Sequence, residues 1–311
     1  MHNTLARPVD AVMVKRRVAH FQSRSIKTHA KASGLRLCLS MVDLTTLEGK
    51  DSPEKIRALC AKAANPAGGS GPMKHVVPPV AAVCVYPTLV HEAKQALRGS
   101  TVRVASVATG FPSGQYPLSL RLRDVQDAVH AGADEIDMVI SRGLFLAGKY
   151  DEIRQEIRET KAACGPAHLK IILETGELET LDNARRASDL AIESAMSVPG
   201  AQPLRDGEVF IKTSTGKVQP AATMHVTLVM LQAILECHAR GGPRIGMKPA
   251  GGIRAAKSAL HYLVMVKETL GDAWLSPHLF RFGASALAND LLRQILRLER
   301  GPYAAAWDLA E

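Results

Sequence analysis

The segment GEVFIKTSTGKVQP, residues 207–220, places Lys212 at the end of a short apolar run that leads directly into a glycine-containing loop. A second apolar run, in PRIGMKPAGGIR at residues 243–254, ends in the same way at Lys248. Short runs of this kind are typical of strands that are buried on both faces of a parallel sheet. Side by side in a poorly solvated cleft, the two lysines are expected to depress each other's basicity. A lysine with a lowered pKa can act as a nucleophile near neutral pH.

Eight apolar runs of this type alternate with longer amphipathic segments from residue 35 onward. The runs are LRLCLSMVD (35–43), VAAVCVY (80–86), TVRVASVAT (101–109), DEIDMVI (134–140), HLKIILE (168–174), EVFIKT (208–213), PRIGMKP (243–249) and HLFRFG (278–283). This alternation predicts βαβ units and a parallel sheet. Eight repeats favour a closed (β/α)8 TIM barrel over an open doubly wound sheet, which would show a GxGxxG fingerprint after its first strand.

The chain has 311 residues, a length that (β/α)8 barrels commonly use as one domain. We predict an α/β fold with a basic N-terminal helical extension (1–34), a barrel domain (35–300) and a C-terminal tail (301–311). Helices are expected at segments such as 53–63, 150–164 and 181–195, with Glu156 on an exposed polar face. Two segments rich in glycine and proline, at 64–79 and 197–207, should lie at the end of the barrel opposite the catalytic rim.

The net charge of +9 is concentrated at the N-terminus, where residues 1–32 carry seven Lys or Arg and one acid. The remaining residues are nearly balanced and lack the interleaved aromatic residues of single-stranded nucleic-acid platforms. We therefore expect no nucleic-acid partner. The basic segment itself is interpreted as a solvated amphipathic helix packed on the barrel, with a transit peptide or a site for an anionic partner as alternatives.

The five cysteines are scattered without CxxC spacing, and the histidines form no recognisable ligand pair. Neither a disulfide framework nor a metal site is indicated, and no cofactor is expected. The sequence contains no apolar stretch long enough to cross a membrane and no signal-peptide pattern. We therefore expect a soluble cytoplasmic protein without a membrane partner.

Polar or charged residues occur at or near the ends of several predicted strands, and in a barrel these ends face one cleft. They are Asp43, Cys84, Asp137, Glu174, Lys212 and Lys248. A single residue of this kind is equally well explained as part of a structural ion pair. The set as a whole provides what an imine-forming aldolase needs: a nucleophilic amine, a neighbour that lowers its pKa and a carboxylate that moves protons.

Three glycine-containing loops follow the last three predicted strands, at residues 214–217, 250–254 and 283–285. Glycine allows backbone N–H groups to approach an anion, and these loops of a (β/α)8 barrel commonly bind phosphate. Lys217 and Arg254 add positive charge there. The loops predict a small phosphorylated aldehyde or sugar as substrate.

The chain resembles the deoxyribose-phosphate aldolases, a family of class I aldolases, over residues 43–292. The resemblance rests on VDLTTL, AAVCVYP, VASVATGFPSG, ADEIDMVI, LKIILETGEL, FIKTSTGK, MKPAGGIR and RFGAS. It implies reversible cleavage of 2-deoxy-D-ribose 5-phosphate to D-glyceraldehyde 3-phosphate and acetaldehyde, in deoxyribonucleoside catabolism. Longer, eukaryotic-type members also carry a basic helical segment before the first strand.

By the same resemblance, Lys212 is the Schiff-base lysine and Lys248 is the lysine that perturbs it. Asp137 is the general acid/base that works with a bound water, and Asp43 is its partner in proton transfer. Thr45, Cys84 and Thr215 contact the substrate or line its pocket. The phosphate site is implied to consist of Gly216, Lys217, Gly251, Gly252, Gly283 and Ser285.

The sequence departs from the family at Ala286, where members commonly have Ser or Thr. The missing hydroxyl predicts a weaker hold on phosphate, since a hydrogen bond to a charged group contributes roughly 1.5 to 3 kcal/mol. Two other functions stay open at this point. One is a different Schiff-base barrel, such as a transaldolase or a keto-acid aldolase. The other is a scaffold whose basic segment recruits RNA or an anionic partner. Homo-oligomerisation is left open as well.

Overall fold

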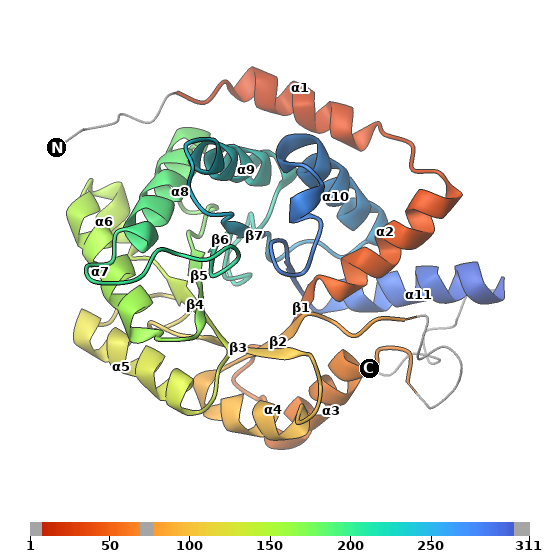
Figure 1. The fold of residues 1–311 in the computed structure, drawn as a ribbon, viewed down its shortest axis with the longest axis horizontal. Helices are drawn as coiled ribbons and strands as arrows, with labels where there is room; N and C mark the ends of the chain where they lie inside the picture. The colour runs from red at the N-terminus through yellow and green to blue at the C-terminus, as the bar shows by residue number, and fades with distance from the viewer. Residues whose placement is uncertain (1–7, 69–76, 302–311) are drawn as a thin grey trace.

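The computed structural model describes residues 8–68 and 77–301, which form a barrel of eight parallel strands surrounded by helices (Figure 1). The strands are β1 (Val42–Thr45), β2 (Ala82–Val85), β3 (Arg103–Val107), β4 (Glu135–Val139), β5 (His168–Ile172), β6 (Val209–Lys212), β7 (Gly246–Lys248) and β8 (Phe282–Ala284). From β1 to β7 each strand pairs with the next one in sequence, and β1 also pairs with β8. Two isolated bridges, Met247 with Phe280 and Ala250 with Gly283, join β7 to the β8 segment. The predicted (β/α)8 fold is confirmed.

The helices follow the strands in the order that the sequence predicts. The α-helices of the barrel are α3 (Pro53–Ala64), α4 (Val90–Ala96), α5 (Leu118–His130), α6 (Arg142–Leu146), α7 (Tyr150–Ala163), α8 (Leu181–Met196), α9 (Met224–Ala239), α10 (Ala256–Leu270) and α11 (Ala286–Arg300). Short 3-10 turns lie at η2 (Pro87–Leu89) and η3 (Asp272–Trp274). The hydroxyls of Ser52, Thr180 and Thr223 cap α3, α8 and α9 by accepting backbone N–H bonds, which explains where these helices begin.

The first predicted strand is wrong over residues 35–40. These residues form the end of helix α2 (Thr28–Ser40), and β1 begins only at Val42. In LRLCLS the apolar residues fit both a two-residue period and a helical one. The side chains that are buried, Leu35, Cys38 and Leu39, follow the helical spacing.

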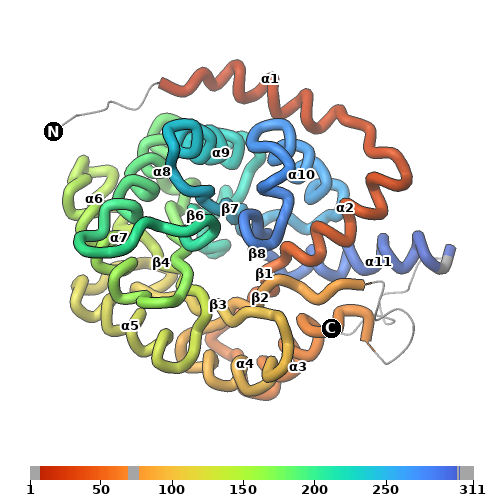
Figure 2. The backbone as a smooth tube through the Cα atoms, in the orientation of Figure 1, coloured from red at the N-terminus to blue at the C-terminus, as the bar shows by residue number. Residues whose placement is uncertain are grey.

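The N-terminal extension consists of α1 (Ala11–Gln22) and α2, which together wrap the outside of the barrel (Figure 2). Helix α1 packs against α9 and α10, and α2 packs against α10 and α11. Val14, Val18 and Phe21 are buried under α1 while its basic residues lie outside. The interpretation as an amphipathic helix packed on the barrel is confirmed for α1, and α2 crosses the predicted boundary at residue 34. Residues 1–7 and the predicted tail from residue 302 lie outside the described part.

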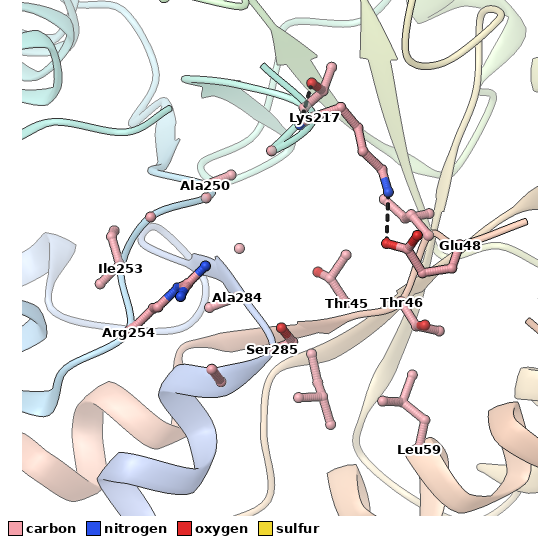
Figure 3. A pocket seen from close by; sticks show the side chains of 18 of the residues that line it. Thr45, Thr46, Glu48, Leu59, Lys217, Ala250, Ile253, Arg254, Ala284 and Ser285 are labelled. Atoms are coloured by element: carbon pink, nitrogen blue, oxygen red, sulfur yellow. Dashed lines mark hydrogen bonds and ion pairs between the residues drawn. The ribbon is translucent and has the colours of Figure 1, made fainter. Parts of the chain in front are cut away.

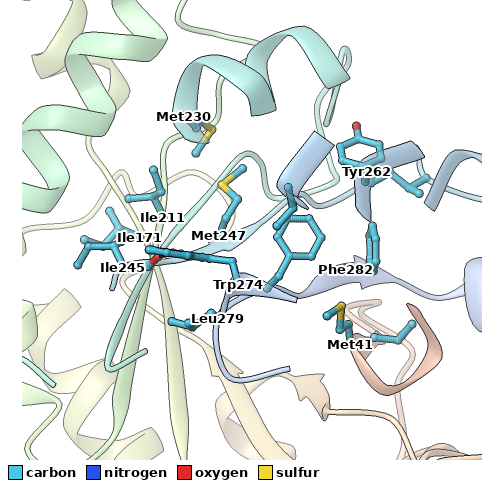
Figure 4. Close-up of a cluster of buried hydrophobic side chains, with 14 of the residues drawn as sticks. Met41, Ile171, Ile211, Met230, Ile245, Met247, Tyr262, Trp274, Leu279 and Phe282 are labelled. Atoms are coloured by element: carbon cyan, nitrogen blue, oxygen red, sulfur yellow. Dashed lines mark hydrogen bonds between the residues drawn. The ribbon is translucent and has the colours of Figure 1, made fainter. Parts of the chain in front are cut away.

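The main hydrophobic core fills the space between the strands and the surrounding helices. Figure 4 shows part of this core, where Met247 lies beside Trp274 and the rings of Tyr262 and Phe282 meet edge to face. The indole N–H of Trp274 donates to the Ile245 carbonyl at 2.9 Å, which satisfies the one polar group that this ring buries. The outer faces of β7 and β8 are thereby fixed in position, and with them the residues on their inner faces.

Helix α7 differs from its prediction at one position. Glu156 is buried and forms an ion pair with Arg121 of α5 at 2.8 Å, and it also accepts hydrogen bonds from Ser141. A buried charge needs such partners, so Glu156 joins α5, α7 and the loop after β4. It does not belong to an exposed polar face.

The two segments rich in glycine and proline connect helices to the amino ends of strands. Residues 65–68 follow α3, and residues 197–207 join α8 to β6. Both therefore lie at the end of the barrel away from the strands' carboxyl ends, as predicted, although residues 69–76 are outside the described part. Within residues 8–68 and 77–301, no helix has the length and apolarity that a membrane span requires.

Shortening Phe21 to alanine should destabilise the docking of α1, because the side chain is only 3% exposed. We expect Phe21→Ala to lower the free energy of unfolding by about 3 kcal/mol, measured by urea denaturation. The matched control is Val12→Ala on the exposed face of the same helix, which should change it by less than about 0.5 kcal/mol. Equal effects of the two variants would contradict the docking of α1 through Phe21.

Candidate active site

A cavity of about 690 Å³ opens at the carboxyl ends of the strands. Nine of the thirteen predicted site residues line it: Thr45, Lys212, Thr215, Gly216, Lys217, Gly251, Gly252, Gly283 and Ser285. The other four, Asp43, Cys84, Asp137 and Lys248, do not border the cavity and are fully buried. Lys212, which is 2% exposed, lines this cavity and also contacts the buried Asp137.

Asp137 of β4 accepts hydrogen bonds from three lysines at once. Its Oδ2 atom lies 2.7 Å from Lys212 Nζ and 2.8 Å from Lys248 Nζ, and its Oδ1 atom lies 2.9 Å from Lys170 Nζ. The pairing register places Lys212 beside Lys248 and Asp137 beside Lys170. The barrel therefore brings together the three predicted residues Asp137, Lys212 and Lys248.

Lys212 is the one lysine of this group whose pKa is lowered. Burial is the main cause, because it disfavours the ammonium form, and the neighbouring Lys248 adds to the effect while Asp137 opposes it. Burial by itself would raise the pKa of Asp137, but Lys170, Lys212 and Lys248 together lower it well below its usual range. Asp137 is therefore ionised at neutral pH.

The expectation that both lysines lose basicity is wrong for Lys248. Burial disfavours its charged form, but the carboxylates of Asp137 and Asp43 outweigh burial and raise the pKa of Lys248. Asp43 Oδ2 lies 2.6 Å from Lys248 Nζ. Lys248 is thus a stable cation that opposes protonation of Lys212.

Three further charged residues complete the buried group, and the sequence interpretation missed them. Lys170 Nζ lies 2.5 Å from Glu135 Oε2, and the guanidinium of Arg281 contacts Asp43 at 2.7 Å and Glu135 at 3.0 Å. The available signal was a charge inside an apolar run, as in HLKIILE, DEIDMVI and HLFRFG. The charged residues of this buried group other than Lys212 are called the barrel ion cluster from here on. They are Asp43, Glu135, Asp137, Lys170, Lys248 and Arg281.

Two other predicted residues support the site from positions outside the cavity. The Cys84 thiol lies 4.0 Å from Asp137 Oδ2, and burial, followed by the charge of Asp137, raises its pKa. The thiol therefore stays neutral. Glu174 accepts bonds from the backbone N–H and the hydroxyl of Thr215, and the Thr215 hydroxyl in turn accepts from Lys217 N at 3.1 Å. Glu174 thus fixes the loop that follows β6.

Glycines shape the wall of the cavity that the last three loops form. Gly251 has φ +76°, and a Cβ there would lie 2.8 Å from the Ala221 Cβ. At Gly283 a Cβ would lie 2.7 Å from the Ala250 Cβ and 3.1 Å from Lys248 Cε. Larger residues would therefore push these loops apart. Helix α11 begins directly behind this wall, and its first backbone N–H groups have no partner within the helix.

Two cationic side chains lie at this wall (Figure 3). Arg254 extends into the cavity from the loop after β7. Lys217 contacts Glu48, at 2.8 Å, from the loop after β1. Glu48, which the sequence interpretation did not single out, is 57% exposed and so can move away from Lys217 into water. No group of His, Cys, Asp or Glu residues suited to hold a metal ion occurs among the residues that the structure describes.

An amine of lowered basicity, held against an ionised carboxylate at the carboxyl rim of a (β/α)8 barrel, is the arrangement that imine-forming enzymes require. The sequence pattern of the DeoC/LacD family aldolases matches residues 37–292. The chain belongs to this family and is an aldolase.

The chain is similar to the deoxyribose-phosphate aldolase of Homo sapiens, with 46% identity over 303 residues that cover 95% of this chain and 92% of the human protein. The deoxyribose-phosphate aldolase of Mus musculus is 44% identical, with 97% and 93% covered. A solved deoxyribose phosphate aldolase from Aeropyrum pernix, described as tetrameric, has the same fold with a TM-score of 0.59 at 20% identity. The match covers 94% of this chain and 100% of that one.

Replacing Lys248 by methionine should raise the pKa of Lys212 for two reasons. Asp137 Oδ2 would accept a hydrogen bond from Lys212 alone, and the positive charge beside Lys212 would be removed. We expect a rise of about one to two pH units. The measurement is the rate at which an amine-specific reagent labels Lys212 as a function of pH, followed by peptide mass spectrometry. Lys267→Met, at an exposed pair with Asp272, should leave the profile unchanged. An unaltered profile in Lys248→Met would rule out this coupling.

Proposed function

We propose that this protein is a class I aldolase that reversibly cleaves 2-deoxy-D-ribose 5-phosphate to D-glyceraldehyde 3-phosphate and acetaldehyde, a step of deoxyribonucleoside breakdown. The observation that carries the proposal is the contact of Lys212 Nζ with Asp137 Oδ2 at 2.7 Å, at a lysine that lines the cavity. The names of the relatives and the lowered pKa of Lys212, caused first by burial, support it.

In the proposed reaction the Lys212 amine adds to the aldehyde carbon of the open-chain sugar, and loss of water gives a protonated imine. The bond between C2 and C3 then breaks as the C3 hydroxyl loses its proton. Its electron pair forms the enamine, and C3 becomes the aldehyde of the first product. Protonation of the enamine at C2 and addition of water to the imine release acetaldehyde and restore Lys212. Asp137 is proposed to transfer protons in these steps, because it is ionised and contacts Lys212. Lys248, which also contacts Asp43, holds Asp137 in position.

The phosphate is proposed to bind at the wall of the cavity that the last three loops form, between Lys217 and Arg254. The backbone N–H groups of the glycine loops and the start of α11 support an anion there. Thr45 and Thr215 line the cavity between this wall and Lys212, where they can contact the sugar. Cys84 is proposed to contribute packing beneath the site and not direct contact.

The setting of this activity is also a proposal. The cysteines of the described residues are free thiols, which fits a reducing compartment such as the cytoplasm. A homo-oligomer is proposed because the relative from Aeropyrum pernix is described as tetrameric. The nearly balanced charge outside the basic segment supports a small molecule, and not a nucleic acid, as the partner.

Trapping with borohydride tests the proposed nucleophile. Incubation with acetaldehyde and sodium borohydride should attach a reduced two-carbon adduct to Lys212, identified by peptide mapping. Lys212→Met should abolish the adduct, while Lys149→Met, at an exposed lysine that does not line the cavity, should retain it. Mapping of the adduct to another lysine would exclude the proposed role. A panel that includes keto acids and transaldolase substrates would then show whether 2-deoxy-D-ribose 5-phosphate is the preferred substrate.

Glu48 should weaken the binding of phosphorylated substrates, because its carboxylate competes with phosphate for Lys217. We expect Glu48→Gln to lower the KM for 2-deoxy-D-ribose 5-phosphate about two- to fivefold, since an exposed ion pair is weak. The KM for unphosphorylated 2-deoxy-D-ribose should not change. Glu54→Gln, at a more exposed carboxylate, is the control. A higher KM for the phosphorylated sugar, or equal changes for both sugars, would contradict this role.

A further inference from the structure

The barrel ion cluster lies inside a barrel whose walls are apolar, so its total charge is constrained. Its six members are 0 to 3% exposed. Three are carboxylates and three are cations: Asp43, Glu135 and Asp137 against Lys170, Lys248 and Arg281. The cluster is therefore electrically neutral without any contribution from Lys212. A protonated Lys212 would add one uncompensated charge in a region of low polarity, which is costly.

Contacts of 3.0 Å or less connect all members of the cluster. From Lys212 the chain of contacts runs to Asp137, from Asp137 to Lys170 at 2.9 Å, and from Lys170 to Glu135 at 2.5 Å. A second path runs from Asp137 to Lys248, then to Asp43 at 2.6 Å and to Arg281 at 2.7 Å. The two paths meet where Arg281 contacts Glu135 at 3.0 Å. A change of charge at Glu135 or Arg281 therefore alters the electrostatic potential at Asp137 through a chain of direct ion pairs.

Glu135 and Arg281 lie away from the cavity. Glu135 is the first residue of β4, and Arg281 precedes β8, so both are near the amino ends of the strands. Neither lines the cavity. They cannot touch a substrate bound at Lys212, and they are not members of the predicted site. Any effect on the reaction must pass through the cluster.

We propose that Glu135 and Arg281 set the charge state of Lys212 from the opposite end of the barrel, by keeping the buried cluster neutral when Lys212 is an uncharged amine. The inference rests on the proposed role of Lys212 as the nucleophile. Glu135 and Arg281 are positioning residues with opposite effects. Loss of the Glu135 charge leaves the cluster with an excess cation, which opposes protonation of Lys212. Loss of the Arg281 charge leaves an excess anion, which favours protonation.

The other groups around Lys212 do not provide this balance. Those that face it or the cluster from the surrounding elements are the Cys84 thiol (β2), Arg103 (β3), His168 (β5) and Glu174 (after β5). Burial raises the pKa of Cys84, and burial with the nearby Arg103 lowers the pKa of His168 to about 4, so both are neutral at pH 7. The Glu174 carboxylate accepts a hydrogen bond from the backbone N–H of Thr215, in the loop after β6. Arg103 contacts Glu135 at 3.3 Å but is 39% exposed, so water compensates much of its charge.

The test measures the pH dependence of Lys212 labelling by an amine-specific reagent in the full-length protein, which requires no substrate. Glu135→Gln should move the midpoint to lower pH and Arg281→Gln should move it to higher pH, each on the order of one pH unit. The double variant Glu135→Gln/Arg281→Gln restores neutrality and should return the midpoint toward that of the wild type. Arg281→Lys, which retains the charge, should behave like the wild type.

Opposite shifts that cancel in the double variant would support the proposal, because general loosening of the barrel would move both single variants in the same direction. Shifts of equal sign, or no shift in either variant, would overturn it. If borohydride trapping also failed at Lys212, the proposed function would fail separately, since labelling reports the charge state alone.

Arg103 provides a second test that does not place an unbalanced charge in the core. Arg103→Gln removes a half-exposed cation from Glu135 and should raise the Lys212 midpoint by a few tenths of a pH unit, less than Arg281→Gln. The matched control is Arg205→Gln at the same end of the barrel, where the side chain is 78% exposed and contacts Glu208. It should cause no shift. An unshifted midpoint in Arg103→Gln, with the protein folded by circular dichroism, would also count against the proposal.

Discussion

A single carboxylate, Asp137, accepts hydrogen bonds from three lysines inside the barrel, and the arrangement of the site follows from this contact. An ionised group without water needs strong partners, and the strand register brings Lys170, Lys212 and Lys248 to it. Two of the lysines also contact a second carboxylate, which keeps them charged. Among the residues that the structure describes, Lys212 contacts no second carboxylate, and it is the one lysine of these three that lines the cavity. All three lysines are buried, so the different directions of their pKa shifts follow from the number of carboxylates within reach, and not from the type of residue.

The chemical and the binding parts of the site are built differently. The chemical part consists of buried side chains on the strands, where packing fixes each atom. The binding part consists of loops and a helix start, where Lys217 is paired with the exposed Glu48 and Arg254 extends into the cavity. Interactions on the exposed side are weak and easily exchanged, which would suit the proposed release of a charged product. Ala286 lines the same wall without a hydroxyl, so under the proposed function backbone N–H groups would carry a larger share of the anion binding.

Much of the fold and of the site could be predicted from the sequence, because strand ends and glycine loops leave local patterns. The eight runs were found, and Asp137, Lys212 and Lys248 meet as expected. Other features depend on three-dimensional pairing. Residues 35–40 fitted two periods, and only packing against α10 and α11 decided for the helix. Lys170, Glu135 and Arg281 lie within apolar runs, where nothing local indicates that their charges cancel. The same holds for the pair of Glu48 and Lys217, which are 169 residues apart.

The contact between Arg281 and Asp43 joins residues that are 238 positions apart in the chain. During synthesis on the ribosome, the acidic residues Asp43, Glu135 and Asp137 emerge well before Lys248 and Arg281. An unfinished chain therefore contains more of the cluster's carboxylates than of its cations. Burying these unpaired carboxylates away from water would cost free energy. The docking of α1 and α2 has the same dependence, because both pack on helices from the last third of the chain, α9, α10 and α11. Since β1 pairs with β8, the barrel can close only when its last strand is present.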